Sequence, residues 1–181
     1  MELNLIIPTT SIDVAHPLPL KYFPNPILSQ PCVRVEESKE TKLEIAAAMI
    51  KTTRQYDGVG LAGPQVGMTH KVLVWESTPG LPHAMFNPTD IELDISEWFK
   101  FQEGCLSVPG YFETRERAIG IQVVFEDYTG TTHTAQFRGL EAFIIQHELD
   151  HLNGQLFIDN LSKLKKDRLA RKINKQLNNR V

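Results

Sequence analysis

Hydrophobic positions recur with two periods along this chain, and the change of period separates helices from strands. Small and apolar residues spaced three to four apart predict a helix over about 41–56 that closes at an Asp-Gly pair. A second helix is predicted over about 139–152, and its first half is apolar nearly all round, which indicates a buried helix. A third is predicted over about 162–178, with Ser162 as its N-cap.

Alternating or β-rich runs predict the strands between these helices. They cover residues 71–76, 83–87, a longer segment near 91–102, 118–126 and 131–137. The last two flank residues 127–130, whose Asp-Tyr-Thr-Gly sequence predicts a hairpin turn. The glycine-rich segment after the first helix is expected to be a shaped loop or an irregular strand.

The predicted elements describe an α+β fold. Short antiparallel strands pack around one buried central helix, and a further helix follows at the C-terminus. Residues 1–40 contain six prolines and are expected to form an extended arm with little regular structure. With 181 residues, the chain suits a single catalytic domain over 1–181.

The amino-acid composition says little about the partners of this protein. The chain is 41% hydrophobic and 23% charged, and its net charge of −3 requires neither a nucleic-acid nor a membrane partner. No apolar run approaches the ~18 residues that span a bilayer. Because the two cysteines cannot form a disulfide framework and no signal peptide is recognisable, we expect a cytoplasmic protein. Cys32, in the proline-rich arm, is interpreted as a small buried residue.

His147 and His151 belong to an H-E-x-x-H pattern inside the buried second helix. Residues four apart share one helix face, so both imidazoles can reach one metal ion with Glu148 beside them. Two histidines and a glutamate buried without such a role would be costly. The pattern therefore predicts a metal site.

A catalytic metal of this kind usually has three protein ligands and an open position. The third ligand is not the histidine found further along in some H-E-x-x-H proteins, because Phe157 stands there. Asp159 and Asp167 remain possible. Cys105 is the better candidate, because a thiolate binds zinc or ferrous iron strongly and its Glu-Gly-Cys-Leu-Ser segment forms a polar turn.

Three segments together resemble the peptide deformylase family. They are Gly58-Val59-Gly60-Leu61-Ala62-Gly63-Pro64-Gln65, then Glu103-Gly104-Cys105-Leu106-Ser107, then Gln146-His147-Glu148-Leu149-Asp150-His151. The resemblance covers roughly residues 20–178. One departure is Gly63, where the family usually has alanine. An added glycine is expected to loosen the backbone near Gln65 without removing a functional group.

The resemblance implies a hydrolase that removes the formyl group from N-terminal formyl-methionine of nascent polypeptides. Cys105, His147 and His151 would hold one divalent ion, with Fe(II) favoured and zinc, nickel or cobalt possible. Glu148 would transfer the protons. Gln65 and the backbone N–H of Leu106 would stabilise the oxyanion.

The substrate backbone is expected to lie beside Gly60, with Gly110 on its other side. Val59, Leu140, Phe143 and Ile144 are candidate walls of a methionine pocket, although simple core packing explains Leu140 equally well. The C-terminal helix is locally basic, which is typical of a solvated face but also compatible with contact to the ribosome.

Two alternatives remain open at this stage. A zinc endopeptidase with another third ligand would keep its metal after Cys105→Ser. A paralogue of the family could instead act on another substrate, or could be inactive and merely bind nascent chains or ribosomes, in which case it would have no need for Glu148. Near the cysteine, Glu103 is expected to pair with either Arg115 or Arg117, and Asp150 to orient a ligand or anchor the helix.

Overall fold

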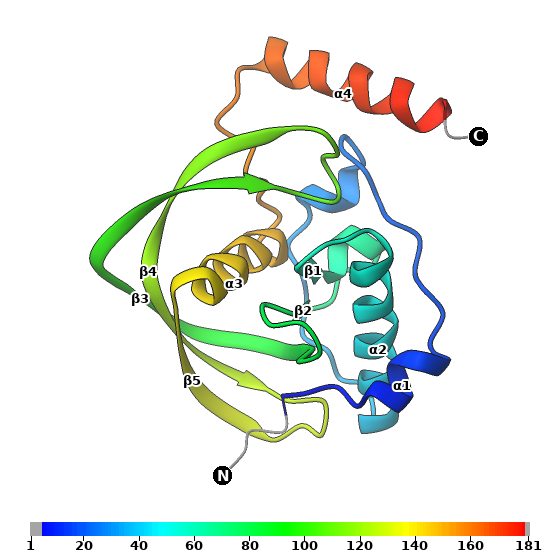
Figure 1. Ribbon diagram of the computed structural model, residues 1–181, viewed down its shortest axis with the longest axis vertical. Helices are drawn as coiled ribbons and strands as arrows, with labels where there is room; N and C mark the ends of the chain where they lie inside the picture. Colours follow the sequence, from blue (N-terminus) through cyan, green and yellow to red (C-terminus); the bar gives the residue numbers. More distant parts are fainter. Residues whose placement is uncertain (1–4, 180–181) are drawn as a thin grey trace.

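The computed structural model describes residues 5–179, which form one antiparallel sheet folded around a central helix (Figure 1). The five strands neighbour one another in chain order: β1 (Gly60–Ala62), β2 (Val72–Trp75), β3 (His83–Gly104), β4 (Phe112–Glu126) and β5 (Thr132–Arg138). This arrangement confirms the predicted α+β class.

The two longest strands differ from prediction. The expected segments 83–87 and 91–102 are one strand, β3, whose pairing with β4 shifts register at three places. These irregularities let the strand continue past Asn87-Pro88 and bend around the helix. Strand β4 begins at Phe112, six residues before the predicted start. Its first residues alternate between exposed and half-buried, because only β3 lies beside them.

The bounds of the helices agree more closely with those predicted from the sequence. They are α1 (Thr9–Val14), α2 (Lys39–Gln55), α3 (Gly139–Leu152) and α4 (Lys163–Asn178). Ser38 caps α2, and Ser162 caps α4 as predicted. Within residues 5–38, the proline-rich arm has two short helical elements, α1 and the 3-10 turn Pro26–Ser29. Burial of Ile12 and Leu28 explains why these short turns persist.

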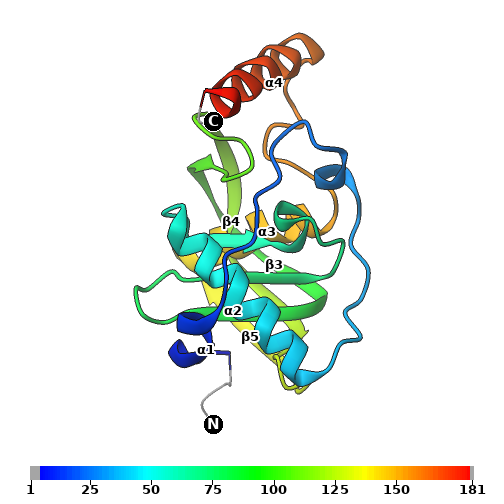
Figure 2. The same cartoon turned by 90° about the vertical axis from the view of Figure 1, so that its right-hand side faces the viewer.

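Helix α3 lies inside the curve of β3 and β4, and its apolar residues join the main core. Ile145 and Leu149 pack with Trp75, Met85 and Phe125 from three strands. Helix α2 packs against β1 and β2 in a second cluster. Helix α4 stands at one end of the molecule (Figures 1 and 2), where Leu169 and Ile173 face a third cluster.

Among residues 5–179, every helix is too short or too polar to cross a membrane.

Candidate active site

The two predicted histidine ligands lie one turn apart on α3, and Cys105 follows the last residue of β3. The donor atoms of Cys105, His147 and His151 lie within 4.8 Å of one another. The sulfur of Cys105 is 3.3 Å from Nε2 of His151. The curve of β3 around α3 therefore brings together residues that are 46 positions apart in the chain.

These three residues fit a divalent cation. Sulfur and nitrogen ligands of one tetrahedral ion stand about 3.5 Å apart, close to the observed separation. Within residues 5–179, Oε2 of Glu148, beside these residues, is buried and has no hydrogen-bond partner. Burial lowers the pKa of His151 well below its ordinary value, which favours the neutral imidazole that a metal requires. A thiolate with two imidazoles suits zinc and ferrous iron.

A buried ion-pair network supports His147. Its Nδ1 lies 2.8 Å from Glu103, and Glu103 also accepts hydrogen bonds from both Nε and Nη2 of Arg117. A third nitrogen of Arg117 donates to Asp150 at 2.8 Å. Arg117, and not Arg115, is therefore the partner of Glu103. Asp150, which lies on α3 itself, holds this arginine against the helix.

Glu148 is 4% exposed and lies against β1. Burial is the main cause that raises its pKa to about 7. A Cβ atom on Gly60 would lie 2.5 Å from Oε1 of Glu148 and 2.9 Å from Ile144. Gly60 therefore lets α3 approach β1 closely enough to bring the carboxylate to the metal ligands.

Gln65 lies in the 3-10 turn η2 (Gly63–Val66) that follows β1. Its side-chain oxygen accepts a hydrogen bond from the backbone of Ala62 at 2.7 Å, and its Nε2 donates to Cys105 at 3.3 Å. The amide group is therefore fixed beside the sulfur of Cys105. Leu106 follows Cys105 in a turn closed by a bond from the Val108 N–H to the Cys105 carbonyl.

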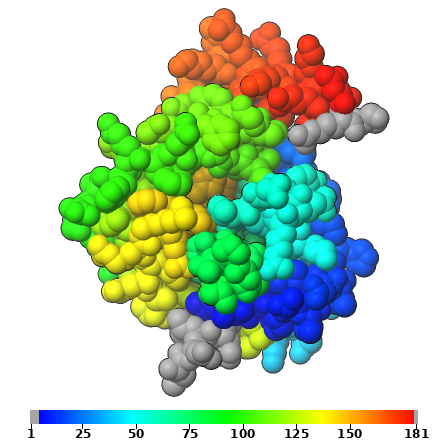
Figure 3. All heavy atoms as spheres, viewed as in Figure 1, coloured from blue at the N-terminus to red at the C-terminus, as the bar shows by residue number. Residues whose placement is uncertain are grey.

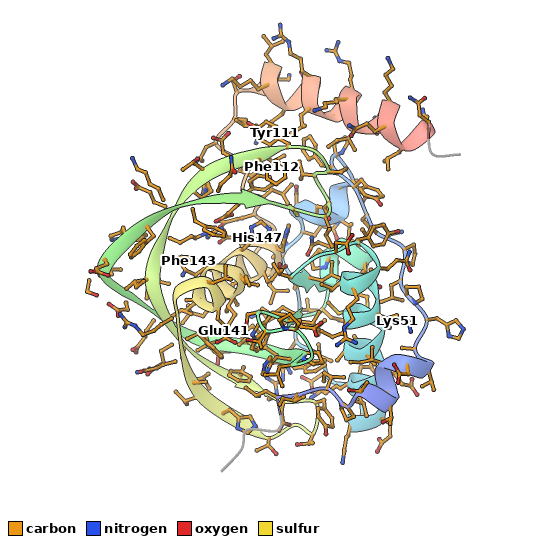
Figure 4. All side chains as sticks on the ribbon, viewed as in Figure 1. Lys51, Tyr111, Phe112, Glu141, Phe143 and His147 are labelled. Carbon is orange, nitrogen blue, oxygen red and sulfur yellow. The ribbon has the colours of Figure 1, made fainter. Side chains whose placement is uncertain are left out.

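A cavity of about 470 Å³ opens next to these groups. Its lining includes most of the predicted residues: Val59, Gly60, Gln65, Cys105, Leu106, Gly110, Phe143, Ile144, His147 and Glu148. In Figure 3 it is the hollow framed by the β3–β4 hairpin and the segment before β1. Figure 4 shows Phe143 and His147 on the side of α3 that faces the hairpin.

Leu140 is the exception among the predicted pocket residues. It is 49% exposed and is not part of the cavity lining. It lies one turn before Phe143, in the first turn of α3, and the larger ring of Phe143 forms the wall at that end.

The cavity is also lined by aromatic residues that were not predicted from the sequence, namely Tyr22, Tyr56, Phe101, Tyr111 and Phe112. Phe101 packs against Phe143 with ring centres 5.3 Å apart. The alternation of Phe99, Lys100 and Phe101 could have indicated that both rings share one face of a strand. Tyr22 comes from the proline-rich arm, whose sequence gives no periodic signal.

Known proteins share both the sequence and the fold. The family model described as polypeptide deformylase matches residues 17–167. A peptide deformylase of Brucella suis biovar 1 (strain 1330) is 37% identical over 167 residues, which cover 90% of this chain and 95% of that protein. The crystal structure of peptide deformylase from Ehrlichia chaffeensis matches with a TM-score of 0.81 at 34% identity, covering 90% of this chain and 98% of that chain.

A peptide deformylase from Synechococcus elongatus, solved in complex with actinonin, matches with a TM-score of 0.78 at 35% identity and covers 88% of this chain and 87% of that chain. The residues that the family model matches include all three motifs. These matches confirm the family resemblance noted in the sequence: the chain belongs to the polypeptide deformylase family.

Proposed function

We propose that this chain, acting as one catalytic domain in the cytoplasm, hydrolyses the formyl amide at the N-terminal methionine of nascent polypeptides and releases formate. One observation carries the proposal. Glu148, buried and with one oxygen unpartnered among residues 5–179, lies in a cavity beside three metal-ligand side chains and the amide of Gln65.

Cys105, His147 and His151 would hold the metal, and ferrous iron is the proposed resident ion. The same donors accept zinc, nickel or cobalt. When bound, a divalent cation supplies a water of lowered pKa and polarises the formyl oxygen. A cavity of about 470 Å³ is large enough for a methionine side chain and the formyl group.

Glu148 would move the proton. Its pKa of about 7 lets the carboxylate accept a proton from the attacking water and return it to the departing amine. Glu148 lies against Gly60, and both residues line the cavity in which the substrate would bind.

Gln65 and Leu106 would stabilise the negative charge on the formyl oxygen in the transition state. The Gln65 amide is held by its oxygen and donates from Nε2 to Cys105, so this nitrogen is fixed beside the proposed metal ligands before the reaction. The Leu106 backbone N–H offers a second donor next to Cys105. Two fixed donors are typical of sites that stabilise tetrahedral oxyanions.

The substrate backbone would lie between Gly60 and Gly110, both of which line the cavity. Recognition through the main chain suits an enzyme that accepts many different proteins. Val59, Phe143 and Ile144 would surround the methionine side chain. Leu140 would contribute at most at the outer edge, because half of it is exposed.

The first test is formate release from a short formyl-methionyl peptide by protein loaded anaerobically with ferrous iron or nickel. Glu148→Ala with unchanged metal content is expected to lose activity. Glu116→Ala, which removes an exposed carboxylate on β4, is the matched control and is expected to keep it. A fully metallated wild-type protein without formate release would contradict the proposed function.

We also propose that α4 contacts the ribosome. Its exposed cations are Lys163, Lys165, Arg168, Arg171, Lys172 and Lys175, and Arg180 lies outside the described residues. Cosedimentation with ribosomes that weakens with salt and disappears after removal of residues 163–181 would support this contact. Unchanged cosedimentation after that removal would exclude α4 as the contact.

A further inference from the structure

Gly63 occupies a position where no side chain fits. A Cβ atom built on it would lie 2.6 Å from the carbonyl oxygen of His70 and 3.0 Å from that of Met68. Both obstructing atoms belong to the backbone, so they cannot rotate away as the end of a side chain could. The expectation that Gly63 loosens this region is therefore wrong, because the chain is closely packed around it.

The obstructing carbonyls belong to residues 67–71, which we call the strap. It is bound to η2 by a hydrogen bond from the Met68 N–H to the Gly63 carbonyl at 3.0 Å. The arm holds its other side, since Val33 donates to Thr69 at 2.9 Å and accepts from Lys71 at 2.8 Å. The strap is thus fixed on both sides and cannot yield easily.

Gln65 follows Gly63 by two residues in the same turn and is 1% exposed. Its carbonyl accepts a hydrogen bond from the Lys21 N–H at 2.7 Å. Its side-chain amide spans from the Ala62 N–H to Cys105. Any displacement of η2 therefore moves the amide relative to the sulfur of Cys105.

We propose that Gly63 is a positioning residue for Gln65, because its missing side chain lets the strap press η2 into the place that aims the Gln65 amide at the reacting oxygen. The proposal rests on the oxyanion role of Gln65 in the proposed function. It extends that role to a residue which touches neither substrate nor metal.

Gly63→Ala is expected to shift η2 by several tenths of an ångström. Since Gln65 would act in the transition state, kcat should fall about ten-fold while KM and metal content stay unchanged. Gln65→Ala alone should lower kcat by about 10²–10³-fold. In the Gln65→Ala background, Gly63→Ala should have no further effect on kcat, because the amide that it misplaces is gone.

Gly120→Ala is the matched control. A Cβ there would lie 3.2 Å from Asp94 and from the Phe137 carbonyl. These contacts are within the β3–β5 part of the sheet and do not involve η2, so the variant introduces crowding without moving η2. Its kcat is expected to equal that of the wild type.

A second readout does not depend on activity. In zinc-loaded protein, the side-chain amide NMR signal of Gln65, assigned by its loss in Gln65→Ala, should move in Gly63→Ala and stay in Gly120→Ala. If Gly63→Ala does not fold, Val33→Pro serves instead. It removes the N–H that holds Thr69, and should also move this signal and lower kcat.

The outcomes separate the two proposals. If Gln65→Ala keeps its full kcat, the oxyanion role of Gln65 fails. If Gln65→Ala is impaired but the effect of Gly63→Ala is absent or fully additive to it, the positioning role of Gly63 is overturned. An unmoved Gln65 signal in the Gly63→Ala or Val33→Pro protein would also overturn it.

Discussion

Nδ1 of His147 lies 2.8 Å from the carboxylate of Glu103, and this contact fixes which nitrogen of the imidazole is free. Burial acts to raise the pKa of Glu103, but hydrogen bonds from His147 and Arg117 outweigh it and lower that pKa to about 2. The ionised carboxylate can only accept, so the proton resides on Nδ1. Nε2 of His147 is then the nitrogen available to a metal.

Glu103→Gln should weaken metal binding. Its amide cannot accept as strongly from Nδ1, and it leaves Arg117 without a full counter-charge, so the zinc affinity is expected to fall about ten- to a hundred-fold. Competition with a chromophoric chelator measures the affinity. Glu92→Gln, on the exposed part of β3, should bind zinc like the wild type. Equal affinities for the wild type and Glu103→Gln would show that this contact does not support the ligand.

Arg117→Ala should destabilise the protein by about 3 kcal/mol, because it leaves buried Glu103 and part of Asp150 without their partner. Arg115 offers a close control, since it lies two residues away on the same strand and is half-buried. Arg115→Ala should change the free energy of unfolding by less than about 0.5 kcal/mol. Urea denaturation of the metal-free proteins compares them, and similar losses would refute the assignment of Arg117.

Asp127 organises the β4–β5 turn and links it to acid stability. Its carboxylate accepts hydrogen bonds from the Thr129 N–H at 2.7 Å and from the Thr131 N–H at 3.1 Å, and it lies 2.9 Å from His133. Burial acts to raise the pKa of Asp127, but the bonds from Thr129 and His133 hold it below its ordinary value.

Asp127→Asn should therefore lower stability at pH 7 by about 1–2 kcal/mol. Since the folded-state pKa lies below the unfolded value of about 3.9, the carboxylate stabilises the fold above that pH and loses its effect as pH falls through the folded-state pKa. Urea midpoints of metal-free wild type and variant should draw closer as the pH falls below about 4. Asp167→Asn, on the exposed side of α4, should follow the wild type throughout. A difference between wild type and Asp127→Asn that does not shrink at all between pH 5 and pH 3 would contradict the assignment.

Phe143→Leu should reduce discrimination between methionine and norleucine, which has a similar shape but no sulfur. A sulfur–aromatic contact contributes about 0.3–1.5 kcal/mol, so the wild type should prefer the formyl-methionyl peptide by about two- to ten-fold in kcat/KM. The preference should approach one in Phe143→Leu and persist in Leu140→Ala. A preference retained in Phe143→Leu would place the methionine elsewhere in the cavity.

The elements with strong local signals could be predicted from the sequence. The apolar first half of α3 predicted a buried helix. The spacing of His147 and His151 on that helix predicted a metal site. Cys105 could be proposed because its turn is too polar for core packing. These inferences need only local geometry and ligand chemistry.

The remaining features depend on contacts between distant segments. Nothing local distinguishes Arg115 from Arg117, because both alternate with glutamates and only the packing of β4 on α3 selects Arg117. The continuity of β3 was hidden by Asn87-Pro88 and by acidic residues that the bent hairpin exposes. The tight contact between Gly63 and the strap involves backbone carbonyls. Their positions depend on the fold, so the residue types of the strap do not predict this contact.

The site can assemble only after the ribosome has added residues that are far apart in the sequence. Lys42 pairs with Glu126 across 84 residues, and Cys105 meets His151 across 46. A ribosome that adds roughly 5–20 residues per second makes Cys105 a few seconds before His151, so the site cannot assemble until α3 has been made. Until then, a growing chain holds Cys105 without either of the histidines that would share its metal ion.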